Sequence, residues 1–288
     1  MTDSRKYPRV RPAWVVCAWL IITTVAVTAP AEDTLETGNR VYRGTVIKAD
    51  AQTVMIEMDG GNQIGVPRGS ILRAWVERPE NIAAGLAAFA EGKMQQAYTA
   101  LRGVVPRFVG LDVDWEVSGT MAYGRAATAL RKYEKAEKIF LGFLKLHPEH
   151  PLRISAHLGR AGIRVAEGKH EEALKSLLPL SASFDKSVKP EGNRRALAAE
   201  AFLGVGKAQE GLSRLEEALE AYLKVVAIYP EPVYYEEALY RSAALRVQLG
   251  RDETALAAIN ELLEDFPDSA YRNDALDLKN GIERRLES

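Results

Sequence analysis

The residues of this chain that could bind a metal are its four histidines, and two of them stand close together. His147 and His150 share the string HPEH, a spacing that resembles a pair of metal ligands. A zinc site needs three or four ligands with supporting hydrogen bonds, and the sequence offers no further ligand beside this pair. The proline predicts the end of a helix. We therefore expect a solvated turn here, and neither a metal nor a cofactor.

A second group of reactive side chains is the run of acids in LDVDWEV at 111–117. Asp112, Asp114 and Glu116 alternate there, and paired carboxylates can serve as general acid and base. Acids also gather in the first turn of a helix, because the helix dipole favours negative charge at that end. We favour the second interpretation, in which these residues begin a helix.

Other motifs that enzymes use are incomplete. Gly204-Val205-Gly206-Lys207 resembles the end of a phosphate-binding loop, but that loop needs a glycine in place of Ala201 and a hydroxyl residue in place of Ala208. The one cysteine, Cys17, lies in the N-terminal apolar stretch, so the rest of the chain has no cysteine nucleophile and no disulfide. The sequence predicts that the protein is not an enzyme.

Length and composition allow about two folded domains. The chain has 288 residues, of which 47% are apolar and 27% charged, with a formal net charge of −1. This apolar fraction excludes a disordered chain. The balanced charge gives no sign of a nucleic-acid partner.

The first 31 residues have the pattern of an export signal. Four basic residues precede the apolar run Ala13–Val27, and the run is followed by Ala29-Pro30-Ala31. We expect cleavage after Ala31 and a mature protein outside the cytoplasm. The alternative is an inner-membrane anchor formed by residues 13–29, although a spanning helix needs about 20 apolar residues. Membrane contact is expected only through this segment, if it is not cleaved.

Residues 32–80 predict a small β module. Alternation places Val54, Ile56 and Met58 on one strand face, and the string DGGN at 59–62 is typical of a hairpin turn. Four strand-like runs occur in about 40 residues, at 40–48, 53–58, 63–66 and 71–77. The module resembles half of an SH3-like or Sm-like barrel. Sm-like barrels can bind RNA, but the mixed charges of this segment do not favour that function.

From residue 81 to 288 the pattern is helical and repeats five times. A small residue recurs early in each second helix and a large apolar residue follows four positions later: Ala97 and Leu101, Ala136 and Phe140, Ala173 and Leu177, Ala218 and Tyr222, Ala255 and Ile259. Glycines stand twelve residues before three of these alanines, at Gly85, Gly124 and Gly206. Glycines also stand five residues before three of them, in the turns, at Gly92, Gly168 and Gly250. Prolines follow three of them at twelve residues: Pro148, Pro230 and Pro267.

This register resembles the tetratricopeptide repeat, and the end of the chain is similar to periplasmic repeat proteins of the envelope-assembly and Tol–Pal-associated kind. The alanines are 39, 37, 45 and 37 residues apart, whereas the family repeat is about 34 residues long. The resemblance implies a mainly α fold. We expect an α-solenoid of about five hairpins after the β module, closed by a capping helix from about Ser269 to Leu286.

The resemblance also implies a function as a protein-interaction scaffold. In the family, the first helices line a concave groove that takes a peptide or protein. The groove positions carried over by register are Leu86, Phe89, Met121, Arg125, Leu158, Leu203, Lys207, Tyr240 and Gln248. One alternative is an envelope-structural role in which the β module or the repeats contact peptidoglycan or another polymer. Loss of binding after neutralisation of the basic loop residues Lys186, Lys189, Arg194 and Arg195 would favour it. The other is an enzyme of unrecognised type.

Overall fold

The computed structural model describes residues 32–185 and 192–287. The expected export signal at 1–31, the anchor alternative at 13–29 and loop residues 186–191 lie outside the described residues. The remainder belongs to one compact unit that begins at Glu32. Within the described ranges, no helix is both long enough and apolar enough to span a membrane.

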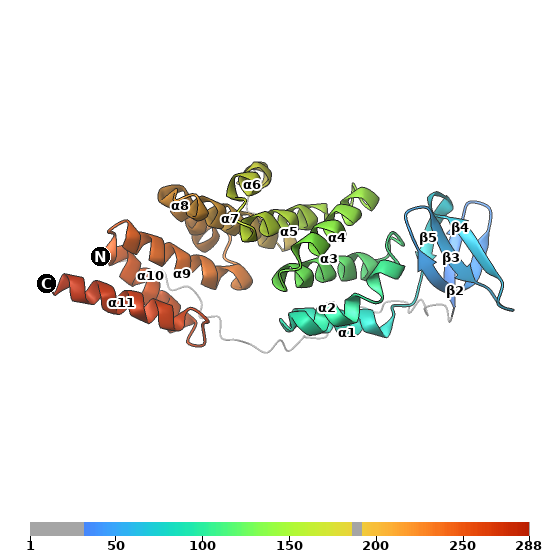
Figure 1. Cartoon of the computed structure of the whole chain (residues 1–288), viewed down its shortest axis with the longest axis horizontal. Coiled ribbons are helices and arrows are strands. Elements are labelled where there is room, and N and C mark those ends of the chain that lie inside the picture. Colours follow the sequence, from blue (N-terminus) through green and yellow to red (C-terminus); the bar gives the residue numbers. More distant parts are fainter. Residues whose placement is uncertain (1–31, 186–191, 288) are drawn as a thin grey trace. The chain divides into compact units, whose positions relative to one another are not determined.

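The N-terminal part is a five-stranded antiparallel sheet in the order β4-β3-β2-β1-β5 (Figure 1). Its strands are β1 (Asp33–Thr37), β2 (Val41–Ala49), β3 (Thr53–Glu57), β4 (Gln63–Pro67) and β5 (Ile71–Trp75), and the one-turn 3-10 helix η1 (Arg68–Ser70) joins the last two. The predicted DGGN turn is present, with positive φ at Gly60 and Gly61. Sequence reasoning missed β1 because only Thr34 and Leu35 of its five residues are buried, so no alternation marks it.

Eleven α-helices are seen in the described residues, as five hairpins followed by a capping helix, and this confirms the predicted fold class. The hairpins are α1 (Glu80–Ala90) with α2 (Met94–Leu101), α3 (Asp114–Ala129) with α4 (Tyr133–Leu146), α5 (Arg153–Ala166) with α6 (His170–Asp185), α7 (Asn193–Gly211) with α8 (Leu215–Ala227), and α9 (Pro232–Gln248) with α10 (Asp252–Asp265). A 3-10 turn, η2 (Val105–Arg107), follows α2, and α11 (Arg272–Leu286) is the cap.

The repeated small residues bring the two helices of a hairpin together. All five alanines of the register are fully buried. The glycines of the first helices lie against the large side chains four residues after those alanines. A β-carbon at Gly85 would lie 2.5 Å from Leu101, and one at Gly124 would lie 2.6 Å from the Phe140 ring. The glycines are therefore needed for the approach of the helices.

The turns inside the hairpins share one backbone conformation. The residue five before each alanine has a positive φ, and it is glycine in three turns: Gly92, Gly168 and Gly250. Arg131 and Ser213 occupy this position in the other two turns, with φ of 56° and 58°. Non-glycine residues adopt this conformation at a cost, so the arginine and the serine are unusual occupants.

The hairpins stack so that first helices contact first helices. Each of α1, α3, α5 and α7 contacts the next helix of this series, and α9 contacts α11. Each second helix packs against the helix that follows it in the chain, which is the first helix of the next hairpin or the cap. The first helices therefore form one layer, and that layer presents a surface shared by all repeats.

Ala218→Leu tests the repeat register. Ala218 is fully buried where α8 approaches its neighbours, so the larger side chain should lower the free energy of unfolding by about 1–3 kcal/mol. Denaturant unfolding measures the change. Ala257→Leu, at an exposed alanine of α10, is the matched control and should change stability little. Equal stability of the two variants would contradict the register.

Candidate functional site

Side chains from four first helices meet in one hydrogen-bonded network on the shared layer. Arg125 of α3 donates from Nη2 to Ser155 Oγ of α5 and to Glu200 Oε2 of α7, at 2.8 Å in each case. The Tyr234 hydroxyl of α9 donates to the same Glu200 oxygen at 3.1 Å. The network therefore joins α3, α5, α7 and α9 through polar contacts.

Burial and neighbouring charges fix the protonation states of the side chains in this network. The Arg125 and Glu200 side chains are 28% and 17% exposed. Burial lowers the Arg125 pKa and the Glu200 charge raises it, with a net rise. Burial, followed by the Glu200 charge, raises the Tyr234 pKa. The guanidinium therefore stays charged and the phenol stays neutral at physiological pH, so the donors are permanent.

A second network ties α7 to α8 and α9. Lys207 and Arg241 both pair with Glu237, each at 2.8 Å. Arg241 also pairs with Glu210 at 3.0 Å, and the Tyr222 hydroxyl donates to Glu210 at 2.6 Å. Burial raises the Glu237 pKa, but Lys207 and Arg241 lower it further, so this carboxylate stays ionised. The cations of α7 and α9 named here are therefore already neutralised within the fold.

Three of the nine predicted groove residues are buried, and two more are half-buried against a core cluster. Met121, Leu158 and Leu203 are 6%, 3% and 5% exposed and belong to core clusters, which leaves them little surface for a partner. Leu86 and Phe89 are half-buried against the cluster that also contains β-strand residues. Helical periodicity alone does not distinguish a groove position from a core position one residue away.

The other four predicted residues reach the shared layer or its edge. Arg125 and Lys207 belong to the two networks above, although these are separate. Tyr240 stacks on Tyr271, just before the capping helix, with ring centroids 4.7 Å apart. Gln248 is the exposed last residue of α9. The structure brings Arg125 and Lys207 to the same helical layer but does not gather all nine residues in one place.

Sequence reasoning missed the acids and the phenol that complete the networks. Glu200 and Lys207 are seven residues apart on α7, and Tyr234 and Arg241 are seven apart on α9. This spacing places both members of each pair on one helix face. Polar side chains seven residues apart were therefore the sequence signal that could have identified these networks.

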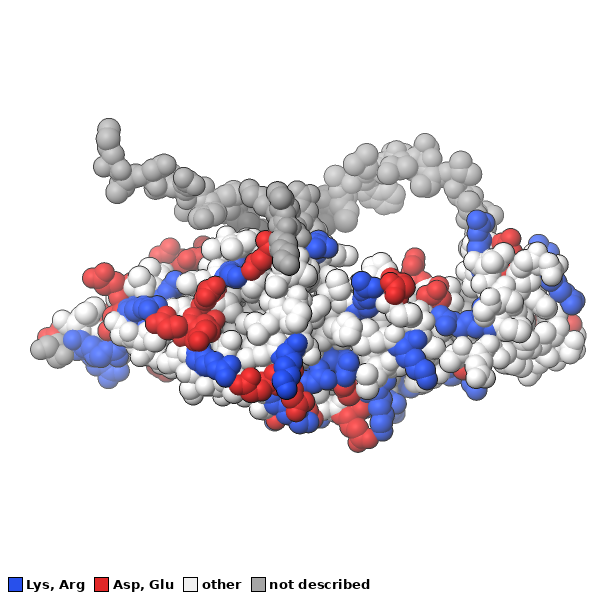
Figure 2. All heavy atoms as spheres, turned by 90° about the horizontal axis from the view of Figure 1, so that it is seen from above, with Lys and Arg blue, Asp and Glu red and all other residues white. Residues whose placement is uncertain are grey.

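Acidic and basic side chains are interspersed on the face of the molecule in Figure 2, which fits pairing between neighbouring helices. The two described arginines of the predicted basic loop patch each contact another side chain. Arg195 pairs with Glu231, and Arg194 lies over the Phe184 ring at 5.5 Å. Lys186 and Lys189 lie outside the described residues.

His147 and two of the alternating acids come together where the sheet meets the first hairpins. The expectation of a solvated turn at His147 is wrong, because its side chain is 2% exposed. Its Nδ1 lies 2.9 Å from Asp112 Oδ1, and its Nε2 lies 3.6 Å from Glu116 Oε2. Glu116 accepts a hydrogen bond from Thr120 at 3.0 Å. Arg68, in the 3-10 turn η1 of the β module, donates to the Leu146 carbonyl at 3.4 Å, so the module contacts this end of α4.

Burial decides the protonation of this cluster. It raises the Glu116 pKa to about 7 and lowers the His147 pKa. Both side chains are closed off, at 1% and 2% exposed, which leaves no surface for a substrate. Two of the three acids mark the start of α3, as expected, since Asp114 and Glu116 lie in its first turn, whereas Asp112 precedes the helix with a positive φ of 63°. Within the described residues, no group of three or more histidine, cysteine or acidic side chains could hold a metal ion.

Comparison with known proteins supports the repeat class. Residues 200–232 and 237–269 match the family model described as tetratricopeptide repeat, and these stretches cover most of the last two hairpins. No curated protein matches the chain. The solved structure of TTC0263, a thermophilic TPR protein in Thermus thermophilus, is 16% identical, covers 73% of this chain and 98% of its own, and has a TM-score of 0.49. MamA 41-end from Desulfovibrio magneticus RS-1 is 19% identical, covers 66% and 96%, and has a TM-score of 0.45.

A double-mutant cycle tests the central network. Arg125→Ala leaves Glu200 without its cation, and Glu200→Ala leaves the guanidinium unpaired, so each should cost about 1–3 kcal/mol of stability. The double variant should lose less than the sum of the two, because the pair is removed together. Denaturant unfolding measures all three. The exposed pair of Lys138 with Glu134 is the control and should show little coupling. Additive losses for Arg125 and Glu200 would contradict the network.

Glu116→Gln tests the buried proton. The folded state keeps the Glu116 carboxyl protonated up to about pH 7, whereas the unfolded chain releases this proton near its ordinary pKa. The contribution of Glu116 to the free energy of unfolding should therefore fall by on the order of 3 kcal/mol as the pH rises from the ordinary pKa of 4.5 to about 7. Glutamine has no proton to lose, so the variant should show a smaller fall.

The readout is the free energy of unfolding as a function of pH. Burial lowers the His147 pKa, so the contribution of this group to the free energy of unfolding rises with pH. The wild type and the variant share this contribution, and the difference between their profiles therefore reports on Glu116. Asp114→Asn, at an exposed acid in the same helical turn, is the control and should keep the fall with pH that Glu116 causes. Parallel profiles of the wild type and Glu116→Gln would contradict a proton held by burial.

Proposed function

We propose that the chain is a non-enzymatic interaction scaffold that binds a protein or peptide on the layer of its first helices. The observation that carries this proposal is the convergence of α3, α5, α7 and α9 at Arg125, Ser155, Glu200 and Tyr234. The network holds four repeats in fixed relation, so a partner would meet a preorganised surface. No cofactor and no nucleic acid enter this function.

The proposed location is the periplasm or cell envelope, with Tol–Pal-associated repeat proteins as the functional analogy. Support comes from the basic residues, the apolar run and the Ala29-Pro30-Ala31 end of the N-terminal segment. Anchoring by residues 13–29 is the alternative.

Intact-mass analysis of the protein recovered from the envelope fraction tests this location. A mass that begins at Glu32 in the soluble periplasmic fraction is the expected result. A full-length mass recovered with the membrane would favour the anchor.

The N-terminal sheet supports the proposal of an SH3-like module. Its strand order β4-β3-β2-β1-β5 and the 3-10 turn η1 before β5 fit such a barrel. The module contacts the helical repeats, because the Trp115 indole of α3 donates to the Val76 carbonyl at 2.9 Å. In this proposal the module is a rigid extension of the scaffold.

Site-specific photocrosslinking tests the binding surface. A photoreactive residue at Gln248, exposed at the end of α9 in the first-helix layer, should give a discrete adduct in cells. The control position is Lys175, which is exposed on the second helix α6, and it should give none. Adducts at Lys175 alone would place the partner on the second helices and contradict the proposal.

A further inference from the structure

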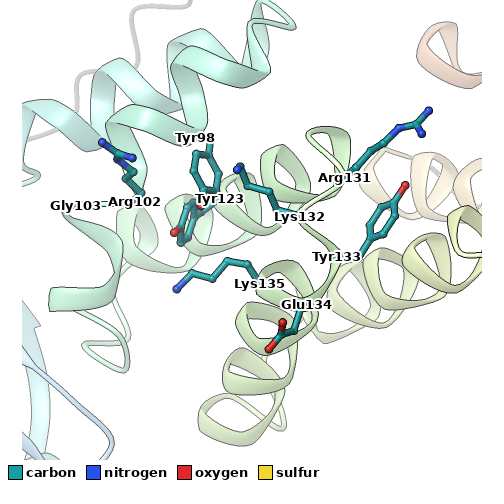
Figure 3. A pocket seen from close by; sticks show the side chains of 9 residues that line it. All are labelled: Tyr98, Arg102, Gly103, Tyr123, Arg131, Lys132, Tyr133, Glu134 and Lys135. Carbon is teal, nitrogen blue, oxygen red and sulfur yellow. The ribbon is translucent and has the colours of Figure 1, made fainter.

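An open pocket lies between the first two hairpins, and none of its lining residues belongs to the central network of the first-helix layer. Its volume is about 830 Å³. The walls come from α2 and the residues after it, from α3, and from the α3–α4 turn with the start of α4 (Figure 3). Its lining includes Tyr98, Tyr123, Arg102, Arg131, Lys132 and Lys135.

Two tyrosines form an aromatic wall of this pocket. The rings of Tyr98 and Tyr123 lie 5.2 Å apart with an interplanar angle of 36°. Burial, together with the hydrogen bond with Tyr98, raises the Tyr123 pKa to about 12. The Tyr123 hydroxyl therefore stays neutral and adds no negative charge. Because Tyr123 is only 2% exposed, the ring area open to a ligand is that of the half-buried Tyr98.

The charge around this wall is strongly positive. Four cations line the pocket against one acid. The acid, Glu134, pairs with Lys138 outside the pocket at 2.6 Å, and Figure 3 shows it turned away from the tyrosines. Lys132 and Lys135 carry their ammonium groups to the ring faces of Tyr98 and Tyr123, at 5.3 and 5.9 Å. Cation–π contacts hold these lysines at the pocket without neutralising them.

These cations differ from those of the first-helix layer. Arg125, Lys207 and Arg241 each pair with a carboxylate. In the described residues, the structure shows no carboxylate paired with any of the pocket cations, which are Arg102, Arg131, Lys132 and Lys135. Arg131 also occupies a left-handed turn position, at φ 56°, where three other hairpins have glycine. The fold thus concentrates unneutralised positive charge beside the half-buried ring of Tyr98.

We propose that this pocket binds an acidic peptide segment of a protein partner. The carboxylates of the segment would pair with Lys132, Lys135 and Arg102, and an apolar or aromatic side chain would pack on Tyr98. Because the pocket is positively charged, charge complementarity favours a negatively charged ligand. The tyrosine wall favours a peptide over a bare polyanion, because tyrosine buries area with little loss of rotamer entropy. This contact is separate from the one proposed for the first-helix layer and does not require it.

The test is fluorescence anisotropy on the full chain with a short dye-labelled peptide in which glutamate alternates with phenylalanine. The wild type should bind this peptide, and salt should weaken the binding. A peptide with glutamine in place of glutamate should not bind. Lys132→Gln combined with Lys135→Gln should weaken binding about tenfold, since two charge pairs are lost.

The matched control combines Lys145→Gln with Lys175→Gln, at exposed lysines of α4 and α6, and removes the same charge. It should bind like the wild type. The thermal melts of both double variants should match the wild type, because the substituted lysines are exposed. If one variant melts early, Lys132→Arg with Lys135→Arg should retain binding.

Three results would overturn the proposal. They are no binding by the wild type, equal loss in the two double variants, and tighter binding of heparin or polyphosphate than of the acidic peptide. The last result would assign the pocket to an anionic polymer. None of these outcomes changes the crosslinking result expected at Gln248, so failure here is distinguishable from failure of the proposed scaffold function.

Discussion

The hairpins of this protein depend on the close approach of their two helices at a small residue of the first helix. In three of the five hairpins this residue is a glycine that lies against a large side chain of the second helix. Phe140 shows the constraint most clearly, because β-carbons at Gly124 and Gly159 would lie 2.6 Å and 2.5 Å from its ring. One side chain of α4 thus packs against both α3 and α5. Residues of this kind hold a hairpin together and also set its contact with the next hairpin.

This packing explains why polar contacts can join distant repeats. With backbones close together, side chains of first helices reach across the layer, and Arg125 meets Glu200, 75 residues later in the chain. The same layer pairs Lys207 and Arg241 with acids. At the pocket beside Tyr98 and Tyr123, by contrast, the described residues place no such acids against the cations. The molecule therefore separates a surface that fixes its shape from a surface with charge available for a ligand.

Much of the fold could be predicted from the sequence because it depends on local spacing. The alanines, their partners four residues later and the turn glycines all lie where the register placed them. The candidate site could not be predicted as well. Met121 and Leu203 were expected at a groove and lie in the core, because a helical period does not show how far the next hairpin rotates. His147 was expected in solvent, but its burial depends on the sheet and on Asp112, 35 residues earlier.

The most direct measurement of the central claim is a double-mutant cycle at Gly206 and Tyr222, where a β-carbon on the glycine would overlap the tyrosine ring. Unfolding free energies are compared for Gly206→Ala, Tyr222→Leu and the combination. The close-approach account predicts that the combination loses at least about 1 kcal/mol less than the sum, since the shorter leucine makes room for the added methyl group. Strictly additive losses would contradict it.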